Sequence, residues 1–261
     1  MRPSAWPAPS LSARSDELPH LLAELRFPLA SSDGNVHPLF EAGKRHNVAL
    51  AAPFFDGLAL SPGQPLSFWR ALGRVTAARG FTDGMELRGG CVVPSVGGGI
   101  CRLSNGLFEL AARAGFRILE RHGHSTEAVP DAPALDATVL WPHIDLRFAP
   151  RSGRARISAR VDGETLVLAA YGERAPEADA ELAVVDEWVE PLGAERIRHA
   201  RIVRRMRDRA SGARGAVEEL GRNRRRVLHA GELGRSCLSC GETACHDRVV
   251  PRSPLVALGR R

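Results

Sequence analysis

The clearest periodic pattern of apolar positions follows three consecutive glycines at residues 97–99. Apolar side chains then recur every three or four residues, at Ile100, Leu103, Leu107, Leu110, Ala111 and Ala114. That spacing places them on one face of an α-helix, and Gly115 is the residue type that commonly ends one. The pattern predicts a helix from about residue 100 to Gly115, with Cys101 at its N-terminal end.

Shorter apolar and alternating runs indicate β-strands around this helix. A short helix is expected at residues 48–52, before Pro53. Strands are expected at 58–60, 116–120, 137–140, 144–148, 156–161 and 165–170. The last two flank Asp162-Gly163, a dipeptide typical of hairpin turns. These patterns predict an α+β fold of mostly antiparallel sheet, with one prominent helix following a Gly-rich turn and a small Cys-rich C-terminal tail.

Changes in composition divide the 261 residues into four parts. Residues 1–45 resemble a leader segment, 46–172 an α+β domain, 173–230 Arg-rich trailing strands, and 231–261 a Cys-rich segment with a flexible end. With 44% hydrophobic and 25% charged residues, the chain is globular in composition rather than collagen-like or disordered. It has no run of roughly 18 apolar residues and no secretory signal, so we expect no transmembrane segment and a cytoplasmic location.

The net charge of +6 is concentrated in an arginine-rich stretch at residues 196–226. Such a stretch can bind nucleic acid or an anionic surface. It contains almost no aromatic residues for stacking on bases, and acidic residues interrupt it. A solvated strand-and-turn surface is therefore favoured, a polyanion site is the alternative, and nucleic-acid binding ranks low.

Cys101 is the candidate nucleophile. A thiol at a helix N-terminus lies beside free N–H groups and the positive end of the helix dipole, which favour the thiolate. His122 and His124, followed by Asp136 and Asp145, occur in the order that a Cys-His-Asp acyl-transfer triad requires in a transglutaminase-like fold. The alternative is a small buried cysteine beside a tight glycine turn. A second alternative is a metal site, because His122 and His124 would share one face of a strand with Cys101 nearby.

The C-terminal cysteines suggest a separate site. Cys237, Cys240, Cys245 and His246 supply the four sulfur and nitrogen ligands that tetrahedral zinc prefers. An iron–sulfur cluster is less favoured, and unmetallated or redox-active thiols are the remaining alternative. We expect this cluster to form independently of the main domain and to offer a docking surface for a protein partner. The odd number of cysteines argues against a disulfide framework.

Several motifs occur in the order found in the VanW-like family, which is named for an accessory protein of vancomycin-resistance gene clusters. They are Gly63-Gln64-Pro65-Leu66-Ser67-Phe68-Trp69, Gly80-Phe81-Thr82-Asp83-Gly84, Gly97-Gly98-Gly99-Ile100-Cys101, Glu120-Arg121-His122-Gly123-His124-Ser125, Asp136-Ala137-Thr138-Val139 and Ile144-Asp145-Leu146-Arg147-Phe148. The resemblance covers roughly residues 46–172, with a further likeness at 201–228. It implies a link to cell-wall or glycopeptide-resistance biology and a peptide-like or cell-wall-related ligand. It also favours Asp145 over Asp136 as the third member of the triad.

Two functional hypotheses follow. The first is a Cys-dependent acyl transferase or hydrolase acting on a peptide-like cell-wall ligand, with Cys101, His122, His124 and Asp145 as catalytic residues. The alternative is a non-enzymatic binding or accessory protein, with a ligand pocket built from Gly97, Gly98, Gly99 and Asn105 around Cys101. Titration of the thiol separates them, because an activated cysteine ionises well below the free value of about 8.5.

Overall fold

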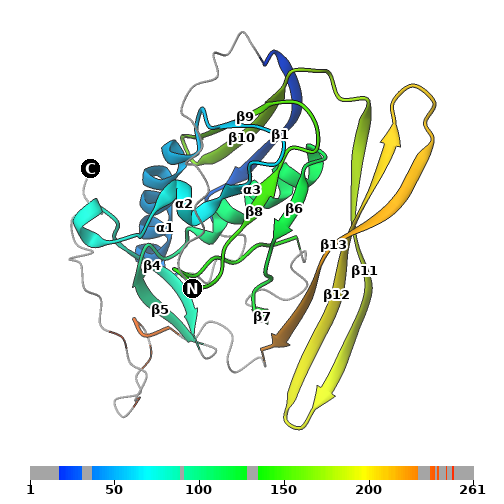
Figure 1. Ribbon diagram of the computed structural model, residues 1–261. Coiled ribbons are helices and arrows are strands. Elements are labelled where there is room, and N and C mark those ends of the chain that lie inside the picture. The colour runs from blue at the N-terminus through cyan, green and yellow to red at the C-terminus, as the bar shows by residue number, and fades with distance from the viewer. Residues whose placement is uncertain are drawn as a thin grey trace.

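The computed structural model describes residues 18–30, 37–88, 91–127, 135–228, 236–238, 240, 245 and 249. These residues form mostly antiparallel strands with few helices, which agrees with the predicted α+β class. Figure 1 shows two parts side by side: a mixed body that contains the helices, and a long three-stranded sheet along one side of it.

The largest sheet of the body has the strand order β1-β10-β9-β2. Its strands are β1 (His20–Pro28), β2 (Ala59–Leu60), β9 (Ala155–Asp162) and β10 (Thr165–Gly172). As predicted, β9 and β10 form an antiparallel hairpin around Gly163, whose φ of 56° suits a glycine. The central strand β10 is almost completely buried, as expected for a strand with neighbours on both edges and a helix across one face.

Two long helices pack in the body, α1 (Pro38–Ala51) and α3 (Cys101–Arg113), with a short α2 (Phe68–Leu72) and the 3₁₀ turns η2 (Ala52–Phe54) and η3 (Ala77–Arg79). The apolar face predicted for α3 is buried. Gly106 lets this helix approach the sheet closely, because an added Cβ would lie 2.6 Å from the Leu168 side chain.

The expectation of one prominent helix is wrong, since α1 is as long as α3. The buried face of α1 includes the polar Lys44 and Asn47 beside Phe40, Val48 and Ala51, so the apolar period of this helix is interrupted.

The prediction of a leader at residues 1–45 also needs correction. Within it, β1 pairs along its whole length with β10, and α1 begins at Pro38. Leu18 and Leu29, at the two ends of β1, are almost completely buried. Residues 18–30 and 37–45 are therefore part of the folded body, because β1 forms an edge of the main sheet, while the rest of the predicted leader lies outside the described residues.

Two smaller sheets complete the body, one beside α3 and one beside α1. Strands β3 (Leu66–Ser67), β8 (Arg147–Ala149) and β6 (Arg117–Glu120) pair in the order β3-β8-β6. Strands β4 (Asp83–Arg88) and β5 (Cys91–Val96) form a hairpin that leads into the glycine turn before α3. The strand expected at 137–140 is not formed, and residues 140 and 144 make a single bridge instead.

The Arg-rich trailing strands predicted for residues 173–230 form one long sheet, β11 (Ala178–Leu192), β12 (Glu195–Asp208) and β13 (Arg214–Val227). At its lower end in Figure 1, β13 pairs in parallel with β7 (Thr126–Glu127) of the body. The stretch is only partly the solvated surface expected from its charge, because Arg204 and Arg225 are 1% and 5% exposed. Among the described residues, no helix is long and apolar enough to span a bilayer.

Candidate active site

Cys101 is the first residue of α3, and this helix has no side-chain cap at its N-terminus. The next three backbone N–H groups donate to carbonyls of the preceding turn, from Arg102 to Gly99 and from Leu103 and Ser104 to Ile100. Within the part of the chain that the structure describes, the N–H of Cys101 itself is left without an acceptor. The thiol therefore lies beside a free donor at the positive end of a helix dipole.

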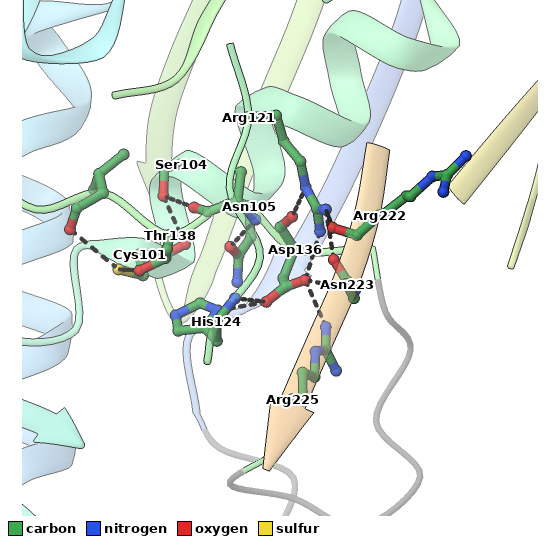
Figure 2. A network of polar contacts seen from close by, with 12 residues as sticks. Cys101, Ser104, Asn105, Arg121, His124, Asp136, Thr138, Arg222, Asn223 and Arg225 are labelled. Atoms are coloured by element: carbon green, nitrogen blue, oxygen red, sulfur yellow. Dashed lines mark hydrogen bonds and ion pairs between the residues drawn. The ribbon is translucent and has the colours of Figure 1, made fainter. Parts of the chain in front are cut away.

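His124 lies between this thiol and a buried carboxylate (Figure 2). Its Nδ1 is 2.5 Å from Asp136 Oδ2, and its backbone N–H donates to the same oxygen over 2.9 Å. The imidazole is also near enough to Cys101 to lower the pKa of its thiol, while the sulfur itself lies 3.8 Å from Thr138 Oγ1 and 4.0 Å from the Val139 carbonyl oxygen. Two bonds to one carboxylate oxygen hold both the backbone and the ring of His124, so the orientation of the imidazole toward the sulfur is fixed.

The electrostatics favour a thiolate–imidazolium pair. Burial opposes ionisation of Cys101, but hydrogen bonding and charge from His124 outweigh it, so the pKa of the thiol falls below its usual value. Burial also opposes protonation of His124, yet its bonds to Asp136 and Cys101 raise the pKa of the imidazole to about 10. For Asp136, burial is outweighed by His124 and two arginines, which hold the pKa of the carboxyl well below its usual range.

Side chains of α3 place the segment that carries Asp136. Asn105 Oδ1 accepts from the N–H of Ala137 over 2.8 Å, and Ser104 Oγ donates to the carbonyl of Ala137 over 2.6 Å. The next residue, Thr138, has its Oγ1 3.8 Å from the Cys101 sulfur. One helix therefore carries the thiol and also positions the segment with the carboxylate.

Arg121 closes the back of the site. Its Nη2 donates to Asp136 Oδ1 over 2.8 Å, and its Nε donates to the Asp136 carbonyl. The guanidinium stacks over the Phe108 ring of α3 and is almost fully buried. A buried carboxylate needs such partners, because an isolated charge in the interior is costly.

The profile of the family described as VanW like protein matches residues 43–171. Residues 43–171 therefore form a VanW-like domain. The match includes Cys101, His124 and Asp136.

Two relatives of this VanW-like domain show how far the similarity extends. Vancomycin B-type resistance protein VanW of Enterococcus faecalis is 28% identical over 167 residues, 62% of this chain and 61% of its own length. The uncharacterized protein YoaR of Bacillus subtilis is 31% identical over 129 residues, 49% of this chain and 43% of its own length. The chain thus spans less than two thirds of either relative. No solved structure matches it.

The carboxylate that is hydrogen-bonded to His124 belongs to Asp136, whereas the sequence analysis preferred Asp145. Asp145 accepts instead from Ser67 Oγ, the N–H of Trp69 and its neighbour Leu146. It therefore ties the start of α2 to the segment before β8. Chain order alone could not separate the two aspartates, since both follow His124.

His122 and His124 do not lie in the regular strand that the metal alternative required. Residues 121–124 follow β6 without strand pairing, so the two-residue period of a strand does not apply. The ring of His122 is half-exposed and lies 3.5 Å from Glu120, while its carbonyl accepts from the N–H of Thr138. Among the described residues, no group of three or more His, Cys, Asp or Glu is arranged to hold a metal ion.

The triglycine of the VanW-like domain is explained by close packing. A Cβ on Gly98 would lie 2.4 Å from the backbone of Gly84, and one on Gly99 would lie 2.5 Å from the Lys44 side chain. The carbonyl of Gly98 accepts from Asn47 Nδ2 over 3.0 Å. These contacts bring β4 and α1 against the turn before Cys101. The Asn105 side-chain oxygen is likewise engaged, by the N–H of Ala137. Ligand binding by Gly97, Gly98, Gly99 and Asn105 stays a prediction.

The tail cysteines are only partly described. Cys237 donates from its N–H to the Val92 carbonyl, and Ser236 forms a parallel bridge with Val92 of β5. The expectation of a tail independent of the main domain is thus incorrect for these residues. Cys240 and Cys245 are described, but His246 lies outside the described residues. Zinc or an iron–sulfur cluster at the tail stays a prediction.

Proposed function

We propose that the protein is a Cys-dependent acyl transferase or hydrolase that acts on a peptide-like, cell-wall-related ligand, with Cys101 as nucleophile. The observation that carries the proposal is the arrangement of His124 between Cys101 and Asp136. A nucleophile, a base within its reach and a third group that orients the base form the pattern of nucleophilic catalysis. The name of the Enterococcus relative supports the choice of ligand class, because it links a similar protein to resistance against a cell-wall antibiotic.

The reaction would run in two steps. The Cys101 thiolate attacks the carbonyl carbon of the acyl donor and forms a C–S bond, while the N–H of Cys101 can stabilise the oxyanion. The C–N bond of the donor then breaks, and protonated His124 gives its proton to the leaving nitrogen. In the second step, water or an acceptor amine attacks the thioester, His124 takes up the proton, and the sulfur leaves as thiolate.

The test is to incubate the protein with cell-wall stem peptides and follow both products and enzyme mass. We expect an acyl adduct on the peptide that contains Cys101, together with hydrolysed or transferred product. Cys101→Ser should lose both, whereas Cys91→Ser, which changes a partly buried cysteine of β5, should keep both. If Cys101→Ser still forms product, the proposal is wrong. If the wild type binds the peptides without adduct or turnover, the non-enzymatic alternative is favoured.

A further inference from the structure

Strand β13 lies outside the matched VanW-like domain, yet two of its side chains reach Asp136. Side chains along a strand alternate between its two faces. In β13 this alternation leaves Asn223 and Arg225 buried, at 4% and 5% exposure, while Arg222 and Arg224 are exposed. The buried pair therefore faces the domain that carries the candidate active site.

Both buried side chains bond within the network around the carboxylate (Figure 2). Arg225 Nη2 donates to Asp136 Oδ1 over 2.5 Å. Asn223 Oδ1 accepts from Arg121 Nη1 over 2.5 Å, and Asn223 Nδ2 lies 3.4 Å from Asp136 Oδ1. One oxygen of the carboxylate is thus held by Arg121 and by β13, which leaves the other oxygen for His124.

The backbone of β13 also fixes the loop that carries His124. The N–H of Arg226 donates to the carbonyl of Ser125 over 2.8 Å, and Arg226 pairs with Thr126 of β7. Directly before His124, Gly123 lies so close to β13 that an added Cβ would be 2.3 Å from Asn223 Oδ1. Strand β13 therefore contacts the segments of both His124 and Asp136, and sets their relative position.

We propose that Asn223 and Arg225 are positioning residues of the Cys101–His124–Asp136 site, and that the functional unit therefore extends from the VanW-like domain into the trailing sheet. The inference rests on the proposed function of Cys101 as an activated thiol. Arg225 keeps Asp136 ionised in a buried place, and Asn223 holds Arg121 and the His124 loop in register. When either side chain is replaced, Asp136 is held less firmly as the counter-ion of the His124 imidazolium. The imidazolium then stabilises the Cys101 thiolate less, so the thiolate is protonated at a higher pH.

The experiment measures iodoacetamide alkylation of Cys101 in the full chain against pH, resolved from the other cysteines by mass spectrometry of peptides. The variants are Arg225→Gln, Arg225→Lys and Asn223→Ser. The matched control is Arg224→Gln, which changes the neighbouring exposed arginine of the same strand. Thermal unfolding of each variant is recorded alongside. The pH profile separates a positioning role from a structural one, because loss of stability alone does not move the ionisation of a thiol in the folded protein.

We expect an acid-shifted profile for the wild type and an unchanged one for Arg224→Gln. In Arg225→Gln and Asn223→Ser the midpoint should rise by about one pH unit, so that alkylation on the acid limb slows about tenfold. The midpoint for Arg225→Lys, which keeps the cation, should lie between those of these two variants and that of the wild type. Profiles of folded Arg225→Gln and Asn223→Ser that superimpose on the wild type would overturn the inference, as would failure of both to fold while Arg224→Gln folds. An ordinary thiol profile in the wild type itself would instead refute the proposed function, and the inference with it.

Discussion

Replacement of Asp136 by asparagine tests the energetics of the buried network. The carboxylate accepts from Arg121 and Arg225, whose side chains are 1% and 6% exposed, and from the ring and backbone of His124. Asp136→Asn keeps the shape of the side chain and removes its charge. Two buried guanidinium groups then remain without an anionic partner at this position.

The expected cost follows from that geometry. Removal of one partner from a buried ion pair typically destabilises a protein by about 3–5 kcal/mol, because the remaining charge is uncompensated. That is a large part of a total stability of about 5–15 kcal/mol. For a chain of this size, the melting temperature should fall by about 6–20 °C, at about 2–4 °C per kcal/mol.

The assay is urea unfolding at pH 7, with Asp162→Asn as the matched control. Asp162 is 64% exposed and lies 3.7 Å from Arg26, so its loss should cost less than about 1 kcal/mol. The double variant Asp136→Asn/Arg225→Gln should recover part of the loss, because it removes one of the unpaired charges. If Asp136→Asn is no more destabilising than Asp162→Asn, the reasoning about the buried network is refuted.

Three further predictions concern the elements around the site. Gly98→Ala should destabilise the protein by about 1–3 kcal/mol in urea unfolding, because its Cβ would meet backbone atoms of Gly84 that cannot move aside; a loss below about 0.5 kcal/mol would contradict the packing argument. Asn105→Ala should cost about 1–3 kcal/mol and slow Cys101 alkylation, because it leaves the N–H of Ala137 without its acceptor; unchanged alkylation would exclude a positioning role. The His124 contribution to stability is fully present below its unfolded pKa of about 6.5 and is lost as pH rises through about 10. The difference in melting temperature between wild type and His124→Gln should therefore shrink from pH 7 to pH 10.5, and a constant difference would contradict the raised pKa.

The sequence by itself determined the local features of this protein. The spacing of apolar residues after the triglycine was enough to predict α3 and to place Cys101 at its first turn, because helix periodicity and glycine punctuation are encoded locally. The β9–β10 hairpin followed from alternation around Asp162-Gly163 for the same reason. His124 was one of two candidate histidines, and the order of cysteine, histidine and aspartate could be read along the chain.

Only the tertiary structure decided which residues meet. Asp136 rather than Asp145 lies at His124, because Ser104 and Asn105 of α3 hold its segment, while Asp145 is bonded to the start of α2. Chain order carries no information about such contacts. The arginines of β13 predict a charged surface, but the two-residue period of the strand buries Arg225 together with Asn223 and leaves Arg222 and Arg224 exposed. Arg225 reaches the Asp136 carboxylate, almost 90 residues earlier in the chain. This contact depends on the parallel pairing of β13 with β7, which local patterns do not specify.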